Sequence, residues 1–434
     1  MGLEPEQADA QDKPARQRKS HTKSRKGCGN CKLRRVKCDE SRPQCRRCVN
    51  FGVECDYDAD AAPALQSRGE GALVFTSIPH SLGPGLGPES PRDSLSPEHK
   101  DDPLVPMLGL RLALHESSEE YCVTQDDVDI LRSFLNRTVY TVGTAQSMDT
   151  YRRELPQLCL KSSHLIHVVL GMTLMHIRYI AATGSWPGEP SQKETFHTYH
   201  GTALFSVLLA QEPVREEDKD ALWACAALLG CITIAGIDAK TPEEAWPLRD
   251  DRIADLDWLR MSDGKKQVWK VVDPLRPTSV WREVMSFAGQ QDPEPRSHVP
   301  ELDMLFPFLT SIYDFNPLVS KPEEEQDPYH TAASILVRLL ELDCNHSTIM
   351  YFLSFLGHMD PRFRALLHKK DPKALLLLAW WYGKMCQYNV WWQSRRMVLE
   401  GQSICMYLER WHSDRPEMIK LLDYPKVMTG MMRA

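Results

Sequence analysis

Six cysteines lie close together near the amino terminus and repeat one spacing twice. They follow the pattern C-x2-C-x6-C-x6-C-x2-C-x6-C, in which each half contains an x2 interval and then an x6 interval. A spacing repeated in this way predicts two similar loop–helix units related by a pseudo-twofold axis. The six residues are Cys28, Cys31, Cys38, Cys45, Cys48 and Cys55.

The number of thiolates indicates which metal centre they form. Thiolates in tetrahedral sites favour zinc, and two zinc ions offer eight ligand positions. Six thiolates fill eight positions only if two of them bridge both ions, whereas a single four-cysteine site leaves two cysteines unused. We therefore predict a binuclear cluster of six cysteines and two Zn ions.

Three other interpretations of the cysteines are a disulfide framework, an iron–sulfur site and unrelated thiols. The amino-terminal segment lacks the apolar run of a secretory signal, so we expect a reducing compartment in which disulfides are rare. The spacing differs from that of ferredoxins, and unrelated thiols do not explain a repeated interval. The other seven cysteines have no mutual spacing and are expected to be reduced thiols: Cys122, Cys159, Cys225, Cys231, Cys344, Cys386 and Cys405.

The stretch from Gly27 to Cys55 closely resembles the fungal Zn2Cys6 binuclear-cluster family of transcription factors. The resemblance implies that Cys28 and Cys45, the first cysteine of each half, bridge the two ions, and that Pro43 lies in the loop between the halves. The basic segment at residues 18–28 and the general sequence pattern of the helical part resemble the subgroup of sterol uptake control proteins. A nuclear DNA-binding regulator is the function that this resemblance implies.

Charge separates the cysteine-rich segment from the rest of the chain. Residues 13–57 contain 14 Lys or Arg and 4 Asp or Glu, a balance of +10, which leaves −17 for the remainder of a chain whose formal net charge is −7. Residues 32–37, after Cys31, include four cations, and residues 49–54, after Cys48, include none. Only the first half is therefore equipped to enter a groove lined by phosphates.

Two adjacent arginines are the candidate base readers. Arg34 and Arg35 match the positions of the family's basic pair, and arginine pairs bidentately with guanine in the major groove. The family typically reads CGG-like triplets, so the resemblance implies a short GC-containing element, although this chain has Arg-Arg where Lys-Lys is frequent. The side chains expected to contact phosphates are Lys32, Lys37, Arg42, Arg46 and Arg47.

Composition divides the chain into four parts. Residues 1–27 are predicted to be a disordered basic arm, and residues 28–57 the cluster domain. Residues 58–106 contain 8 Pro, 5 Gly and 6 Ser, which is typical of a flexible linker. The segment is too rich in Pro and Gly to form a coiled coil. Residues 107–434 are predicted to form a large all-α regulatory domain. We therefore expect a monomer, or a homodimer held by the C-terminal domain.

Apolar residues recur at helical spacing through this last part. Thr124 and Asp127 resemble a capping box, with Asp in place of Glu. The uncharged run at 221–237 and the apolar run at 165–182 are interpreted as core helices, because a membrane-spanning helix needs about 20 residues and these runs are shorter. The other helices are predicted at 193–210, 218–235, 265–272, 279–289, 329–342, 346–357, 372–394 and 396–412.

The resembling subgroup senses a sterol in an apolar pocket, so an apolar ligand is an alternative role for the helical domain. The side chains that would line such a pocket are Trp223, Phe205, Met172, Met175, Trp380, Trp381, Trp391 and Trp392. Methionine and aromatic stripes at helical spacing more often form a core. The histidine pairs His164/His167 and His197/His200 lack matched carboxylates and are expected to be ordinary helical residues.

The chain contains none of the common nucleotide-binding, esterase or metalloprotease motifs, so we expect that it is not an enzyme. The expected partners are double-stranded DNA and the transcription machinery or its coregulators, with no membrane. Genes of sterol or lipid metabolism and a secondary-metabolite gene cluster are both compatible targets.

Overall fold

The computed structural model describes residues 27–28, 38–42, 45, 102–182, 187–249, 253–287, 305, 307 and 327–433. The chain divides into two units, Met1–Ser94 and Leu95–Ala434. The predicted basic arm (except Gly27), the predicted helices of the cluster and most of the predicted linker lie outside the described residues. The domain boundaries at residues 27, 57 and 106 therefore stay predictions.

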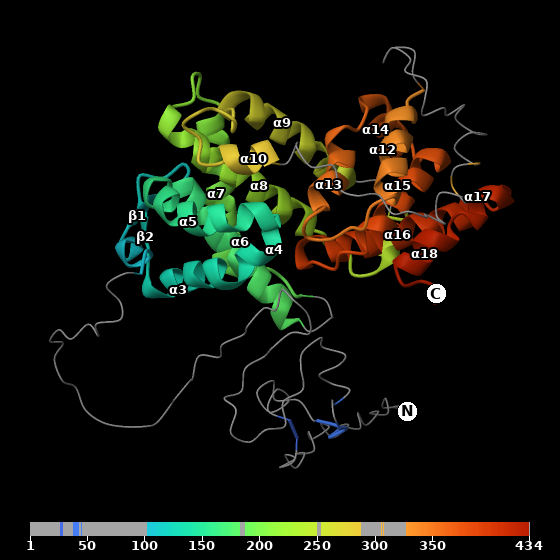
Figure 1. Ribbon diagram of the computed structural model, residues 1–434, viewed down its shortest axis with the longest axis horizontal. Coiled ribbons are helices and arrows are strands. Elements are labelled where there is room, and N and C mark those ends of the chain that lie inside the picture. Colours follow the sequence, from blue (N-terminus) through green and yellow to red (C-terminus); the bar gives the residue numbers. More distant parts are fainter. Residues whose placement is uncertain are drawn as a thin grey trace, which may run out of the picture. The chain divides into compact units, whose positions relative to one another are not determined.

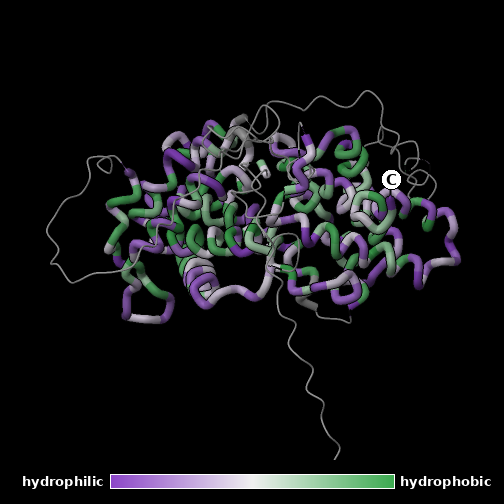
Figure 2. Tube along the Cα trace, turned by 90° about the horizontal axis from the view of Figure 1, so that it is seen from below, coloured by the Kyte–Doolittle hydropathy of each residue, from purple (hydrophilic) through white to green (hydrophobic). Residues whose placement is uncertain are grey.

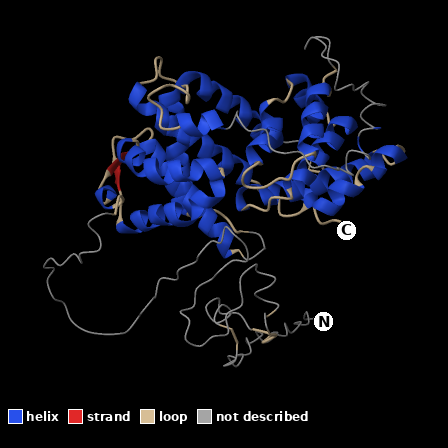
Figure 3. Cartoon of the chain, in the orientation of Figure 1, coloured by secondary structure: helices blue, strands red, loops and turns tan. Residues whose placement is uncertain are grey.

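Helices build the described part of the second unit (Figures 1 and 3), which confirms the all-α prediction. A short antiparallel hairpin precedes them, in which Leu112 of β1 (Arg111–Ala113) lies opposite Tyr121 of β2 (Glu120–Cys122). The helices of the first half are α3 (Gln125–Ser133), a π-helical turn (Phe134–Thr138), α4 (Val139–Val142), α5 (Ala145–Lys161), α6 (Ser163–Ala181), α7 (Gln192–Leu209), α8 (Lys219–Ala235), α9 (Met261–Val272) and α10 (Arg282–Phe287).

Seven further helices complete the described part of this unit. Four of them, α12, α14, α16 and α18, contact the buried helix α15. The helices are α12 (His330–Leu340), α13 (Ile349–Gly357), α14 (Pro361–His368), α15 (Pro372–Met385), α16 (Trp391–Trp411), α17 (Pro416–Lys420) and α18 (Asp423–Met428), and short 3-10 turns such as Ile253–Arg260 connect them. Hydrophobic and hydrophilic residues alternate along the helical tube in Figure 2, as expected for helices with one side in a core.

The predicted start of α3 is confirmed in atomic detail. The Thr124 side chain accepts a hydrogen bond from the Asp127 amide, and the Asp127 carboxylate accepts one from the Thr124 amide. This reciprocal capping satisfies two amides that a helix start leaves unpaired. The same carboxylate accepts the Tyr121 hydroxyl at 2.8 Å, so the cap also ties the hairpin to the helical body.

The two apolar runs at residues 165–182 and 221–237 form core helices. Residues Leu165–Met172 of α6 are buried without interruption, and α3, α7 and α8 pack around that helix. Among the described residues, α6 is the one helix long and apolar enough to cross a membrane, and 67% of its apolar window is buried inside the protein. The second run falls on α8, where most residues from Asp220 to Ala235 are buried.

Two glycines allow α6 and α7 to approach each other closely. A Cβ atom added at Gly201 would lie 2.8 Å from the Val168 amide nitrogen, and one at Gly171 would lie 3.1 Å from the Thr198 amide nitrogen. Any larger side chain would therefore meet backbone atoms of the facing helix. The absence of a side chain at these positions fixes how closely the helices pack.

A buried arginine of α16 joins the two halves of the helical unit. The Arg396 guanidinium donates at 2.8 Å to the carbonyl of Ile234, in the last turn of α8, and contacts the ring of Trp258. It also pairs with Glu400, which accepts the buried Tyr382 hydroxyl. A cation at these carbonyls complements the negative end of the α8 dipole, so the ion pair fastens α16 onto α8.

The structure differs from the sequence prediction at several helices, and the short α4, α17 and α18 are among those that were not predicted. The single helix predicted at 372–394 is two helices, because the chain turns at 386–390 and the Gln393 side chain donates to the carbonyls of Met385 and Tyr388. The helix α5 was not predicted, since Pro156 lies in its interior. The helix α14 was not predicted either, because its eight residues are too short to display a helical period.

Candidate metal centre and the surfaces of the helical unit

Three of the predicted ligands converge in the amino-terminal unit. Cys28, Cys38 and Cys45 are buried, and their Sγ atoms all lie within 4.8 Å of one another. The sulfur of Cys28 is 3.8 Å from that of Cys45 and 3.9 Å from that of Cys38. Residues separated by as many as 17 positions therefore present their thiols to one point.

The distances fit a zinc site. With Zn–S bonds of about 2.3 Å and tetrahedral angles, two sulfurs on one ion lie about 3.8 Å apart. The two distances from Cys28 match this spacing, and neither is a covalent sulfur–sulfur bond. Among the described residues, these cysteines are the one group of three ligand-type side chains close enough to share an ion. Cys31, Cys48 and Cys55 lie outside the described residues, so their part in the centre stays a prediction.

The chain turns sharply after Cys38, and the turn points a backbone amide at the cluster. The Glu40 amide lies 3.3 Å from the Cys38 sulfur, and Glu40 has a φ of 60°, in the left-handed region. The Ser41 hydroxyl donates to the Asp39 carboxylate at 2.6 Å across the same turn. Sequence reasoning missed Glu40, because a backbone donor leaves no signature in residue type.

One of the seven predicted DNA-contacting residues is described. Arg42 is exposed, four positions after the buried Cys38. Asp39 and Glu40 are exposed beside it. Lys32, Arg34, Arg35, Lys37, Arg46 and Arg47 lie outside the described residues, as does Pro43, and their roles stay predictions.

The side chains proposed to line a ligand pocket are core residues. Six of the eight are at most 7% exposed, and Phe205 and Trp391 pack partly buried against the same core. The indole nitrogens of α15 are satisfied by the protein itself, since Trp380 donates to the Leu421 carbonyl at 3.0 Å and Trp381 donates to the Phe352 carbonyl at 2.9 Å. These contacts support the core interpretation.

Two hollows open on the surface of the helical unit. One, of about 400 Å³, is lined by Pro190, Gln192, Thr195, Phe196, Tyr199 and His200. The other, of about 710 Å³, lies among charged side chains of α5, the start of α8 and residues 276–280. Both are open rather than enclosed, and the charged lining of the larger one does not suit a sterol.

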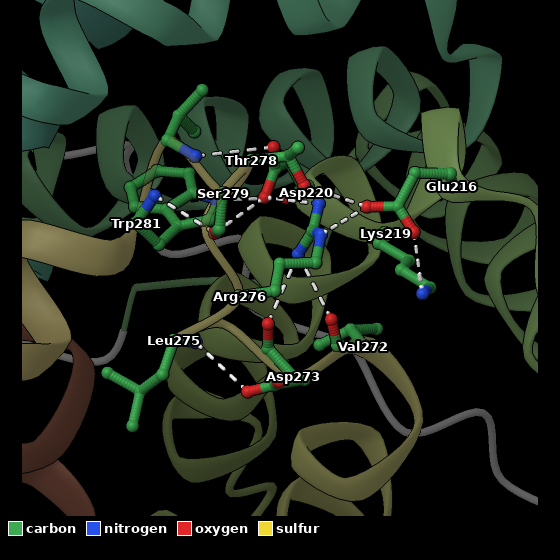
Figure 4. Close-up of polar contacts among 11 residues, drawn as sticks. Glu216, Lys219, Asp220, Val272, Asp273, Leu275, Arg276, Thr278, Ser279 and Trp281 are labelled. Carbon is green, nitrogen blue, oxygen red and sulfur yellow. Dashed lines mark hydrogen bonds and ion pairs between the residues drawn. The ribbon is translucent and has the colours of Figure 1, made fainter.

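An ion-pair network around the buried Arg276 forms one wall of the larger hollow (Figure 4). The Arg276 guanidinium lies 2.9 Å from the Asp220 carboxylate and 2.6 Å from that of Glu216, and it donates to the Val272 carbonyl at 3.0 Å. Asp220 also accepts the Ser279 hydroxyl at 2.8 Å. The network therefore anchors the segment after α9 to the first turn of α8.

The helical histidines have a carboxylate neighbour that the sequence did not reveal. His167 and His197 are buried against each other, and the Nε2 atom of His197 lies 3.9 Å from the Asp127 carboxylate. The same carboxylate lies 2.7 Å from the Lys193 ammonium group and accepts the Thr124 amide in the capping box. The two histidines remain helical residues of the core, as expected, but they belong to a buried polar cluster.

Comparison with known proteins gives the cysteine segment a family. Residues 26–62 match the model of the fungal Zn(2)-Cys(6) binuclear cluster domain. Over 61 residues the chain is 52% identical to Sterol uptake control protein 2 of Saccharomyces cerevisiae, a match that covers 14% of this chain and 6% of that protein.

Two further relatives match longer stretches. The Zn(2)-C6 fungal-type transcription factor afumD of Aspergillus fumigatus is 32% identical over 162 residues, which cover 37% of this chain and 34% of that protein. A Zn(2)-C6 fungal-type transcription factor of Gibberella zeae is 24% identical over 457 residues, which cover 94% and 87%.

The first two matches thus span about a third or less of the relatives' own length, whereas the third spans most of it. The names of all three relatives agree with the expectation that the chain is not an enzyme. The segment at residues 26–62 is therefore a fungal Zn(2)-Cys(6) binuclear cluster domain, which binds two zinc ions.

Proposed function

We propose that the protein is a nuclear, sequence-specific DNA-binding regulator of genes transcribed by RNA polymerase II. The observation that carries this proposal is the convergence of the Cys28, Cys38 and Cys45 sulfurs at spacings that fit one tetrahedral zinc ion. In this proposal the six cysteines hold two ions, and Cys28 and Cys45 bridge them. The basic residues around the cluster then supply the DNA contacts.

The two kinds of DNA contact are assigned to different residues. Arg34 and Arg35 read base edges of a short GC-containing element, because a guanidinium pairs with the O6 and N7 atoms of guanine. The remaining cations hold phosphates and set the affinity, which falls with salt as counterions are released. They are Lys32, Lys37, Arg42, Arg46 and Arg47, of which Arg42 is exposed in the structure.

The experiment is a selection from random duplexes by the full chain loaded with zinc, followed by binding measurements on the selected element at several salt concentrations. Arg34→Ala and Arg35→Ala should weaken binding to the selected element and bring it close to binding of scrambled duplexes. Arg46→Ala should weaken binding to both alike and reduce the salt slope by about 1. Equal losses of selectivity in all three variants would contradict this division of roles.

The regulated genes belong to one of two classes. Likeness to Sterol uptake control protein 2 supports genes of sterol or lipid metabolism. Control of a secondary-metabolite gene cluster is the other class. Mapping the binding sites of the protein across the genome of its native organism separates them, because sites would lie either at dispersed metabolic genes or at one biosynthetic cluster.

The helical unit would regulate DNA binding or recruit coregulators. As an alternative, it would sense an apolar ligand such as a sterol and gate DNA binding or nuclear entry. The alternative needs an interior cavity for the ligand. The side chains of Trp380, Trp381 and Met172 are buried and fill the interior at their own positions. Mass spectrometry of lipids that copurify with the full chain tests it, and chromatography with light scattering distinguishes a monomer from a homodimer joined by this unit.

A further inference from the structure

The turn after Cys38 brings a backbone donor to a zinc-ligand sulfur. The Glu40 N–H donates to the Cys38 Sγ at 3.3 Å, two residues along the chain. Cys38 is itself 3.9 Å from the Cys28 sulfur, so the donor reaches the cluster at one of its converging thiolates. The Cys38 side chain is 5% exposed, which leaves little room for water to take over this hydrogen bond.

The conformation of Glu40 is unusual for its residue type. Its φ of 60° lies in the left-handed region, which is sterically unfavourable for residues with a Cβ and is adopted readily by glycine. The Glu40 side chain is exposed, so burial of that side chain does not hold the backbone in this state. The amide–sulfur contact and the Ser41–Asp39 hydrogen bond both span the turn.

A donor at this sulfur suits a thiolate bound to zinc. Six thiolates on two divalent ions leave the cluster negatively charged, and a hydrogen bond to an anionic acceptor is stronger than one to a neutral acceptor. Groups that hydrogen-bond to metal ligands orient those ligands and raise metal affinity. A neutral, metal-free thiol would gain much less from the same amide.

We propose that Glu40 is a positioning residue of the zinc cluster, acting through its backbone amide on the Cys38 thiolate and not through its carboxylate. The proposal rests on zinc binding by residues 26–62 and makes no use of DNA recognition. It predicts that this position tolerates loss of the side chain but not loss of the N–H group.

Three substitutions in the full chain separate the amide from the side chain. Glu40→Gly keeps the N–H and adopts the left-handed conformation freely. Glu40→Val keeps the N–H, but its β-branched side chain resists that conformation. Glu40→Pro removes the N–H and fixes φ at a negative value. Ser41→Ala serves as the control in the same turn, because it removes only the hydroxyl contact with Asp39.

The measurements are zinc retention against a competing chelator and the sulfur-to-metal charge-transfer band of the cobalt-substituted protein. The Glu40→Pro variant should retain zinc about 10- to 100-fold more weakly, the range typical for loss of such contacts. Its charge-transfer band should shift to lower energy, because the sulfur lone pair loses the donor that stabilises it. Glu40→Val should lie between wild type and Glu40→Pro, and Glu40→Gly should match or exceed wild type.

The spectrum gives a readout that a general loss of folding does not. An unfolded variant loses the band, whereas loss of one hydrogen bond shifts it, and the Glu40→Val protein supplies this shift if Glu40→Pro does not fold. A wild-type band in both Glu40→Pro and Glu40→Val would overturn the proposal, and so would a Glu40→Gly variant as impaired as Glu40→Pro. Failure of the zinc-loaded wild-type chain to bind DNA would instead count against the proposed function alone.

Discussion

The Nδ1 atoms of His167 on α6 and His197 on α7 lie 2.8 Å apart in the interior of the helical unit. Both side chains are fully buried. A hydrogen bond between two imidazole nitrogens needs one protonated and one bare nitrogen, so a second proton on the acceptor ring removes the bond. The contact therefore couples the packing of α6 against α7 to the protonation of this pair.

Acid should destabilise the helical unit through this pair. Burial lowers the pKa of His167 to about 3 and that of His197 to about 4. Below about pH 6.5 the unfolded imidazoles bind protons that the folded ones do not bind until about pH 4. The free energy of unfolding should be highest above pH 6.5 and fall toward pH 4, by up to about 1.4 kcal/mol per pH unit for each histidine.

Urea unfolding of the full chain, followed by tryptophan fluorescence at several pH values, measures this dependence. The free energy of unfolding of the His197→Gln variant should depend less on pH than that of wild type, even if the substitution lowers the stability near pH 7. The exposed His368 provides a matched control, and His368→Gln should leave the slope unchanged. Equal slopes in wild type and His197→Gln would contradict the assignment.

The Arg276 network should be a major anchor of the segment that follows α9. Arg276→Met leaves the buried Asp220 carboxylate without its cation (Figure 4), and breaking a buried pair in this way costs about 3 kcal/mol or more. The variant should therefore unfold at clearly lower urea concentration. Arg260 forms an exposed pair with Asp257 at 3.9 Å, and Arg260→Met should change the midpoint little. Similar midpoints for the two variants would argue against a special role for Arg276.

Removal of zinc should separate the two units functionally. A strong chelator, or Cys38→Ala, should abolish specific DNA binding, because metal binding and folding are coupled in clusters of this size. The helical circular dichroism signal should persist, since the main hydrophobic core is built from residues between Leu104 and Leu422. The exposed Cys122 supplies the control, and Cys122→Ala should leave both properties intact. Loss of the helical signal with the metal would refute this independence.

The sequence predicted most helices and the metal centre because both follow from local spacing. The repeated interval of the cysteines requires no knowledge of the fold, and the Thr124–Asp127 cap lies within three residues. The missed features depend on distant residues or on the backbone. Asp127 meets His197 only after α3 and α7 pack together, and the Glu40 amide reaches Cys38 only through a left-handed turn.

The break between α15 and α16 belongs to the same class of missed features. Apolar residues continue through 372–394 at helical spacing, so the pattern alone indicates one helix. The chain instead turns where the buried Gln393 reaches back to the Met385 and Tyr388 carbonyls. A side-chain hydrogen bond of this kind competes with continued helix and is invisible to periodicity.

The close packing of α6 on α7 gives a prediction in which the same substitution has opposite effects at two sites. Gly201→Ala would place a Cβ atom 2.8 Å from the backbone nitrogen of Val168, so the helices must separate, at a cost of about 1–3 kcal/mol. Gly264 lies in α9 with no atom within 4 Å of an added Cβ, and Gly264→Ala should stabilise the protein by about 0.5 kcal/mol, because alanine loses less backbone entropy. Urea midpoints that shift in the same direction for both variants would mean that Gly201 does not set the distance between the helices.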